Sequence, residues 1–316
     1  MPSRFEEADL AALARVGIEE RGGLVNVEDF VDPFDPGEDM DRLLGVVPRL
    51  YSGADFAAAV SSVVGAAREK SPVIAMVGAH FIKCGLSRLL IDLMQREVVT
   101  AVALNGAGAI HDFEIAMWGR TSEDVARRLP DGSFGMCSDT ADAMNEATSA
   151  GAGEEEGLGE SLGRALVESE APHLASSILG SGRLLDIPVT VHVALGTDIV
   201  HQHASADGAA IGATSLRDFR ILASVVSELA GGVVLNIGSA VVLPEVFLKA
   251  LSIARNLGGA RGPLTAVSMD MNEPYRAMTN VVRRPTAQEG RGIALRGRHE
   301  LLFPLFWVAV RRSMAG

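Results

Sequence analysis

The sequence predicts an α/β fold in which a parallel sheet is covered by helices on both faces. Two observations predict it. Short apolar runs alternate several times with segments whose apolar residues recur at helical spacing, which is typical of parallel strands joined by crossover helices. In addition, 48% of the 316 residues are hydrophobic, so the chain has enough apolar side chains to bury both faces of such a sheet.

The strands are predicted from apolar runs of strand length: Val73–Val77, Val98–Leu104, Val189–Leu195, Val233–Ile237 and Leu264–Met269. Helical spacing predicts helices over 54–69, Leu86–Arg96, His111–Trp118, Thr121–Leu129, 172–185, Asp218–Leu229 and Glu245–Asn256. The stretch 147–163 is rich in Gly, Ala and Glu and favours a surface connection. After Pro274 the pattern is irregular until the apolar run Leu301–Val310.

Residues 1–50 differ from the rest and predict a peripheral arm. They hold a possible helix, Glu6–Val16, and an acidic stretch that contains proline, Asp29–Asp41. We expect this arm to pack on the body or on a partner subunit, and residues 51–316 to form a single α/β catalytic domain.

Composition excludes several classes of protein. The net charge is −12 and the pI is about 5.1, which argues against binding to nucleic acid or acidic membranes. The N-terminus lacks the apolar core of a signal peptide, and no apolar run has the length of a membrane span. We therefore expect a cytoplasmic protein whose only cysteines, Cys84 and Cys137, are reduced.

The turn after Val98–Leu104 is the strongest indication of a functional site. It reads Asn105-Gly106-Ala107-Gly108, and such small residues let a ligand approach the backbone closely. The spacing of Gly106 and Gly108 is a fragment of the dinucleotide fingerprint, without its third glycine. A tight turn that binds no ligand is the alternative interpretation.

Ionisable residues follow this turn at once. His111, Asp112 and Glu114 are close enough in sequence to act together in proton transfer. The alternative is a solvated first helical turn, where acidic residues favour the helix dipole.

Three other predicted strands also end in small or polar residues. The segments that follow them are Gly78-Ala79-His80 through Lys83, Gly196-Thr197-Asp198 through Gly208, and Gly238-Ser239-Ala240. Because the carboxyl ends of parallel strands meet at one edge of a sheet, we expect these segments to converge on one site. Small residues backed by helix N-termini suit a phosphate or pyrophosphate group.

Single ionisable residues in these segments allow two interpretations each. Asp198 could hold a ribose hydroxyl or cap a helix. Lys83 lies near a helix start, where a cation is unfavourable unless it meets an anionic ligand or a buried partner. Glu245 could serve the site or simply favour the dipole of its helix.

A metal site of a hydrolase could be formed by His201 and His203, with Asp198 or Asp207 as a carboxylate ligand. A single His-x-His without a defined third ligand is more often polar lining or satisfied structure. We therefore predict no metal and keep the metal hydrolase as the least favoured alternative.

Taken together, these blocks resemble the deoxyhypusine synthase family, and its bacterial branch more than its eukaryotic enzymes. The resemblance covers roughly residues 40–310. It rests on Gly78–Gly85, Asn105–Glu114, Gly132–Met136, Gly196–Gly208 and Gly238–Val242.

This resemblance implies a Rossmann-like NAD-binding domain and a homotetramer with sites at dimer interfaces. It also implies a transferase that oxidises an amine to an imine with NAD and moves an aminobutyl group from a polyamine to an acceptor amine. By motif match, the residues that hold NAD are Gly78, Ala79, Asn105, Gly106, Gly108, Asp198, Gly238, Ser239 and Ala240.

The sequence departs from the family pattern at residues that matter for the reaction. The late Trp-Gly-Lys segment, whose lysine carries the covalent imine, has no counterpart, since no lysine follows Lys249. The glutamate pair of the cofactor turn is replaced by Ile110-His111, and a later histidine pair by Pro244-Glu245. We therefore expect an exchange between small amines rather than hypusine formation.

The leading hypothesis is an NAD-dependent enzyme that acts on a small amine or polyamine. Its predicted catalytic residues are His111, Asp112, Asp207 and Glu245, and its predicted substrate-binding residues are His80, Lys83, Glu114, His201 and His203. A non-catalytic NAD-binding regulatory oligomer is the main alternative, because the lysine is missing.

Overall fold

The computed structural model describes residues 10–23, 25–27, 30 and 52–315. Almost all of the predicted acidic stretch Asp29–Asp41, and the beginning of the predicted helix Glu6–Val16, lie outside the described residues. In the described part of residues 1–50 the chain forms a 3-10 turn, η1 (Leu10–Ala12), one helical turn, α1 (Ile18–Arg21), and a two-residue strand.

The main sheet has six strands in the order β5-β3-β2-β6-β7-β8, and every neighbouring pair is parallel. Their bounds are Val73–Val77 (β2), Ala101–Asn105 (β3), Val189–His192 (β5), Val233–Ile237 (β6), Thr265–Asp270 (β7) and Arg291–Arg296 (β8). The chain runs outward from β2 to β5, returns to the middle at β6 and continues to β8. This is the strand order of the doubly wound dinucleotide-binding fold, so the predicted Rossmann-like α/β class is confirmed.

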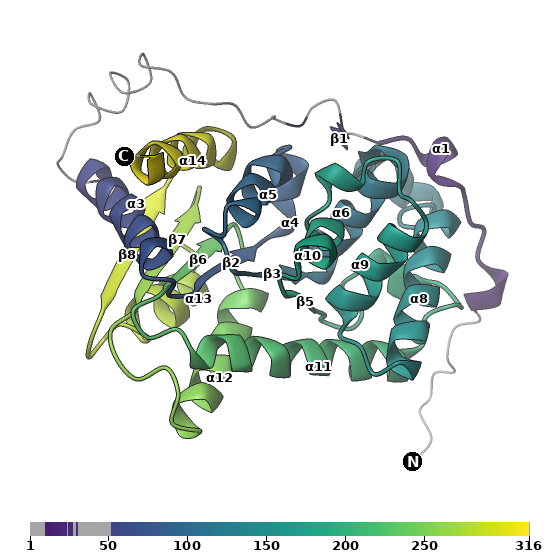
Figure 1. The fold of residues 1–316 in the computed structure, drawn as a ribbon. Coiled ribbons are helices and arrows are strands. Elements are labelled where there is room, and N and C mark those ends of the chain that lie inside the picture. Colours follow the sequence, from purple (N-terminus) through teal and green to yellow (C-terminus); the bar gives the residue numbers. More distant parts are fainter. Residues whose placement is uncertain (1–9, 24, 28–29, 31–51, 316) are drawn as a thin grey trace.

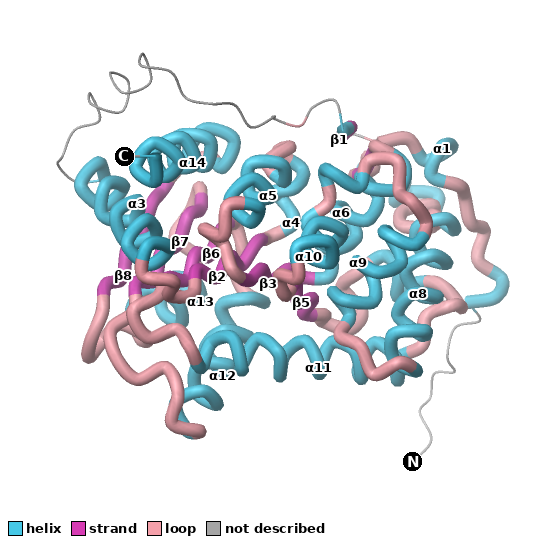
Figure 2. Tube along the Cα trace, viewed as in Figure 1, coloured by secondary structure: helices cyan, strands magenta, loops and turns pink. Residues whose placement is uncertain are grey.

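The strands β2, β3, β5, β6 and β7 are buried on both faces, whereas the edge strand β8 is partly exposed. On β2, Val73, Ala75 and Val77 belong to one apolar cluster, whereas Ile74 and Met76 belong to the other. The first cluster packs on helices that include α3, α5 and α14, and the second on α11 and α12. Figure 1 shows α11 and α12 below the sheet and α3, α5 and α14 above it, and Figure 2 shows the strands enclosed between these layers.

The remaining elements connect the strands or extend the helical layers. The α-helices are α3 (Ser52–Arg68), α4 (Ala79–Lys83), α5 (Ser87–Gln95), α6 (Gly106–Trp118), α7 (Val125–Arg128), α8 (Ser138–Gly153), α9 (Leu158–Glu168), α10 (Ile178–Leu185), α11 (Gly208–Ser227), α12 (Val242–Asn256), α13 (Tyr275–Ala277) and α14 (His299–Ala315). The short helices are η3 (Leu129–Asp131), η4 (Leu174–Ser176), η5 (Ile199–Gln202) and the π-helix η6 (Met278–Arg283). Within the described residues, no helix combines the length and apolar character needed to cross a bilayer.

A second, two-stranded sheet attaches the N-terminal segment to the body. Strand β1 (Val25–Asn26) pairs antiparallel with β4 (Arg120–Thr121), which follows α6 directly. Val16 also bridges to Cys137. The described part of the predicted arm therefore packs on the body beside α6.

The turns after the strands meet at the carboxyl edge of the main sheet, as the sequence predicts. A side chain at Gly78, after β2, would clash with the carbonyl oxygen of Gly238, after β6. A side chain at Gly106, after β3, would clash with the carboxylate of Asp198, which follows β5. Gly78 is thus required by a backbone contact between two turns, and Gly106 leaves the space that the Asp198 side chain occupies.

Replacing Gly78 by alanine is expected to destabilise the fold by about 3 kcal/mol or more, since the new methyl group would overlap backbone that cannot rotate away. Gly65→Ala is the matched control: Gly65 lies inside α3, and a Cβ there meets nothing within 4 Å. That variant should gain about 0.5–1 kcal/mol from helix propensity. Urea unfolding measures the stability of both variants. Equal stability of Gly78→Ala and Gly65→Ala would refute the close contact between Gly78 and Gly238.

Candidate functional site

A cavity of about 220 Å³ lies beside the turns after β2, β3 and β5. Its lining comes from α1, α4, α6, the segment between β4 and α7, the start of α7, the loop before α8, and the start of η5 with the loop before it. The lining residues are Arg21, Lys83, Ala107, Ile110, His111, Glu114, Ser122, Glu123, Val125, Phe134, Thr197, Asp198 and Ile199. Of the predicted site residues, the structure brings Lys83, His111, Glu114 and Asp198 together here.

His111 is held by a relay of hydrogen bonds behind the cavity. Its Nδ1 lies 2.6 Å from Thr121 Oγ1, and the Thr121 hydroxyl donates to Glu114 Oε2. Because Thr121 has only one proton to donate, the arrangement favours the tautomer in which His111 Nδ1–H donates to Thr121. Nε2 then keeps its lone pair and can accept a proton.

Burial sets the protonation state of His111. It lowers the pKa of the imidazole to about 4, and Glu114, which opposes this shift, does not compensate for it. The ring is therefore neutral at neutral pH, as a general base must be.

Glu114 lies beneath the cavity and accepts three hydrogen bonds. Its donors are Arg21 Nη1 at 2.6 Å, Thr140 Oγ1 at 2.8 Å, and Thr121. The side chains of Arg21 and Glu114 are both only 1% exposed, so this is a buried ion pair between α1 and α6. Such a saturated carboxylate has little capacity left for a ligand, and we assign Glu114 to holding Arg21 and Thr121 rather than to binding substrate directly.

Asp198 is nearly buried against Gly106. Burial raises the pKa of its carboxyl to about 6, although the Thr197 hydroxyl acts in the opposite direction. Since Asp198 is still ionised at neutral pH, it can attract a cationic nitrogen in a place with little water.

The predicted cofactor turns lie along the same edge of the sheet. The Asn105 side chain caps α6 by accepting a hydrogen bond from Gly108 N at 3.0 Å. After β6, neither Ala240 nor Val241 donates its backbone N–H to another described residue, and both are exposed at the start of the long helix α12. Free N–H groups at such a position suit the pyrophosphate of a dinucleotide.

Three of the four predicted catalytic residues lie outside the cavity. Asp112 is fully buried and accepts hydrogen bonds from Ser177 Oγ and from the backbone N–H groups of Ile178 and Leu179, at 2.6–3.0 Å. It holds the N-terminus of α10, and burial raises the pKa of its carboxyl to about 6. The prediction that Asp112 is a catalytic residue is therefore corrected: its carboxylate has a structural role.

The other two are surface or capping residues. Asp207 is the exposed N-cap of α11 and accepts from Ala209 N at 2.8 Å. Glu245 pairs with Lys249 and with Arg276 on the outside of α12. We assign these two carboxylates to helix structure.

The predicted substrate-binding histidines are also dispersed. His203 is buried, with Nε2 2.8 Å from the Gly135 carbonyl oxygen, and His201 Nδ1 accepts from Gly196 N at 3.2 Å. Neither belongs to a group of metal-ligating side chains among the described residues. Such a group forms instead from His80, Cys84 and Glu300, whose ligand atoms lie within 4.8 Å of one another; the first lies in α4, the second directly follows α4, and the third is at the start of α14.

Arg21 and Glu123 line the cavity, and Thr121 supports it from behind, although none of the three is predicted as a site residue from the sequence. Glu123 is nearly buried, and its Oε1 accepts from Gly135 N at 2.9 Å. Arg21 lies in the predicted arm, and Thr121 and Glu123 lie in the predicted helix Thr121–Leu129. No motif marks these residues. Arg21 reaches the cavity because its segment is attached to the body by the β1–β4 pairing and by the bridge between Val16 and Cys137.

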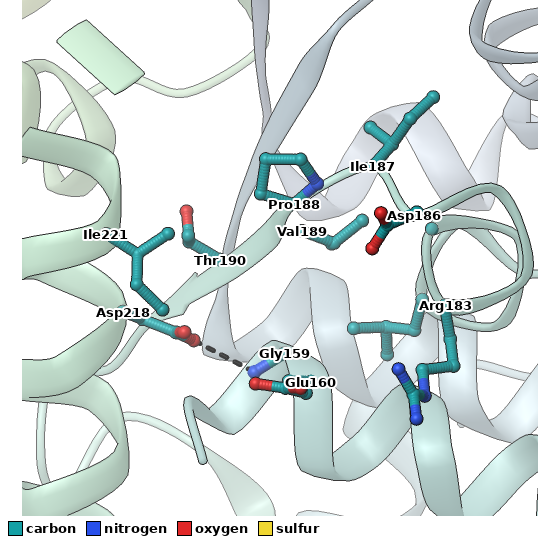
Figure 3. Close-up of a pocket in the computed structure, with 12 residues that line it drawn as sticks. Gly159, Glu160, Arg183, Asp186, Ile187, Pro188, Val189, Thr190, Asp218 and Ile221 are labelled. Atoms are coloured by element: carbon teal, nitrogen blue, oxygen red, sulfur yellow. Dashed lines mark hydrogen bonds between the residues drawn. The ribbon is translucent and has the colours of Figure 1, made fainter. Parts of the chain in front are cut away.

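A second cavity, of about 200 Å³, lies at the opposite, amino edge of the sheet (Figure 3). Asp218 stands in its wall and accepts from Gly159 N and Val191 N at 2.8 and 2.7 Å. Burial raises the pKa of this carboxyl to about 7. Because Asp218 joins α9, β5 and α11, we assign it to the fold.

No family model and no curated protein matches the sequence. Solved structures match it in fold. A complex of AgrE with ornithine and NAD+ is 13% identical, with a TM-score of 0.54, and covers 89% of this chain and 34% of that chain. A putative LOR/SDH protein from Methanococcus maripaludis S2 is 13% identical, with a TM-score of 0.51, and covers 84% of this chain and 72% of that chain.

A putative deoxyhypusine synthase from Entamoeba histolytica is 10% identical and covers 88% of this chain and 96% of that chain, with a TM-score of 0.49, at which the likeness supports no further conclusion. The chain spans about a third of the AgrE and ArgZ chains that it matches. At these identities the comparisons show a shared fold: the protein has the Rossmann-like α/β architecture seen in AgrE and in the LOR/SDH protein.

Proposed function

We propose that the protein is an NAD-dependent enzyme that oxidises a small amine to an imine, lets an acceptor amine replace the first amine on the imine carbon with release of that first amine, and reduces the new imine by return of the hydride. The observation that carries the proposal is His111: a neutral base, fixed by Thr121 and Glu114, in a cavity that also holds the carboxylate of Asp198. The resemblance to deoxyhypusine synthases and the NAD+ in the AgrE complex support the choice of cofactor.

The residues of the chain supply binding and proton transfer. A substrate ammonium group would be held by Asp198, and His111 Nε2 would accept one of its protons, which frees the nitrogen lone pair. NAD, when bound, supplies the hydride acceptor for the carbon next to that nitrogen. The turns at Gly78-Ala79 and Gly238-Ser239-Ala240 would hold it along the carboxyl edge of the sheet.

The cavity fits a small substrate, not a dinucleotide. Sites for drug-sized ligands occupy roughly 300–1,000 Å³, whereas this cavity has about 220 Å³. We therefore place only the reacting amine in the cavity. We further propose that the protein is a homotetramer, which light scattering of the purified protein tests.

The first experiment is calorimetric titration of the purified protein with NAD. Incubation with NAD and putrescine, spermidine or agmatine follows, with reduced cofactor and amine products measured. Binding of NAD together with amine-dependent turnover supports the proposal. Failure to bind NAD would overturn the cofactor assignment, and binding without turnover on any amine would favour the regulatory alternative.

Amine binding is expected to weaken at low pH. Because burial places the pKa of Asp198 at about 6, protonation below that pH removes the charge that attracts the ammonium group. The KM for the amine should rise about tenfold from about pH 7 to about pH 5, following the ionised fraction. Asp198→Asn should abolish this dependence, and Asp207→Asn, at the exposed cap of α11, should keep it. An unchanged dependence in Asp198→Asn would exclude Asp198 as the responsible group.

A further inference from the structure

Arg21 has more hydrogen-bonding capacity than the protein uses. Its side chain is 1% exposed, and only Nη1 contacts a carboxylate, that of Glu114. The Nε and Nη2 atoms are buried without a hydrogen-bond partner. These two atoms form one edge of the guanidinium group, which matches the two oxygens of a carboxylate.

Glu123 has an unused acceptor in the same cavity. Its Oε1 accepts from Gly135 N, but Oε2 is buried without a partner. Arg21 and Glu123 both line the cavity, yet no ion pair joins them. Unpartnered buried polar groups are rare in native proteins and call for a specific explanation, such as a ligand or an ordered water.

The unused groups carry opposite charges, and this restricts the ligand. A polyamine offers only donors and positive charge, so it could pair with Glu123 and Asp198 but would leave Arg21 unpartnered and repelled. A simple carboxylic acid would satisfy Arg21 but not Glu123. A ligand with both a carboxylate and an ammonium group satisfies all of them.

We propose that the cavity binds a small amino acid, with its carboxylate on Nε and Nη2 of Arg21 and an ammonium group on Glu123 and Asp198. Lys83, which also lines the cavity, adds positive charge to it. The inference rests on the proposed function only in taking this cavity as the substrate site. It narrows the substrate class from amines in general to amino acids.

The test compares matched ligands by calorimetry without NAD. Ornithine and putrescine differ by one carboxylate, and so do lysine and cadaverine. The wild-type protein should bind each amino acid about tenfold to a hundredfold more tightly than its diamine, the usual range for charge-assisted hydrogen bonds. Equal or weaker binding of the amino acids would overturn the inference and leave water as the partner of the unused groups.

Variants assign the preference to the two residues. Arg21→Lys keeps a positive charge for Glu114 but lacks the flat edge, so it should lose most of the preference for the carboxylate. Glu123→Gln should weaken both members of a pair and leave the preference in place. Arg120→Lys, at a half-exposed arginine that pairs with Glu19, is the matched control and should bind as the wild type.

Because Arg21→Lys could also perturb folding, thermal unfolding of each variant is measured first, and Glu123→Gln tests the site without altering the Arg21–Glu114 pair. Loss of the preference in Arg120→Lys, or its retention in a folded Arg21→Lys, would contradict the assignment. Amino-acid binding without any NAD binding would overturn the proposed function alone, whereas NAD binding without the preference would overturn this inference alone.

Discussion

Replacing His111 by glutamine is expected to reduce turnover by about 10²–10⁴-fold, the usual contribution of a general base. Glutamine has a similar reach, but it cannot accept a proton at neutral pH. His111 lines the cavity and contacts the protein through Nδ1 and Thr121, so the substitution removes a proton acceptor without removing a helix cap or an ion pair. NAD affinity, measured by calorimetry, should change by less than about twofold, because the predicted cofactor turns lie elsewhere along the edge of the sheet.

Thr121→Val tests the relay behind His111. The substitution keeps the shape of the side chain but removes the hydroxyl that joins His111 to Glu114. Turnover should fall, by less than in His111→Gln, since the base remains but its tautomer is no longer fixed. If His111→Gln retains full turnover in a protein that binds NAD, the general-base role is excluded. Equal losses of NAD binding and turnover would point to a structural role.

Replacing Glu114 by alanine is expected to lower the free energy of unfolding by about 3–5 kcal/mol, the usual cost of leaving one partner of a buried ion pair uncompensated. The guanidinium of Arg21 would lose the one carboxylate contact that it makes among the described residues, at an almost completely buried position. Thr121 and Thr140 would also lose the acceptor of their hydroxyl groups. Denaturant unfolding measures the change.

Glu19→Ala is the matched control for this prediction. Glu19 lies in the same helical turn as Arg21 and pairs with Arg120 at 2.9 Å, but it is 71% exposed. Exposed pairs contribute about 0–1 kcal/mol, so this variant should unfold close to the wild type. Comparable losses in the two variants would mean that burial is not what makes the Arg21–Glu114 pair important.

The sheet could be predicted closely from the sequence, since buried parallel strands are continuous apolar runs. Val73–Val77 and Val233–Ile237 agree with β2 and β6 at both ends. β8 was missed because it is an edge strand, and only two of its residues, Ile293 and Leu295, are buried apolar ones. Helix α11 begins ten residues before the predicted Asp218, because Asp207 caps a first half of small residues without clear periodicity.

The site could be predicted only in part. The convergence of the strand ends follows from topology, and it correctly brought His111 and Asp198 to one edge. Whether a carboxylate after a strand faces the cavity or a neighbouring helix depends on side-chain direction, which spacing does not give. Asp112, one position after His111, therefore points to α10 instead. The role of Arg21 could not be predicted, because its partner Glu114 lies 93 residues away in the sequence.

Arg21 couples the N-terminal segment to the cavity. One guanidinium both fixes α1 to α6 and lines the cavity, so the attachment of this segment and the occupancy of the cavity are thermodynamically linked. If a ligand that contacts Arg21 raises the equilibrium constant for attachment of this segment by some factor, attachment raises the affinity for the ligand by the same factor. Hydrogen exchange of the backbone amides of Ile18–Arg21 therefore reports on ligand binding: it should slow when a ligand occupies the cavity.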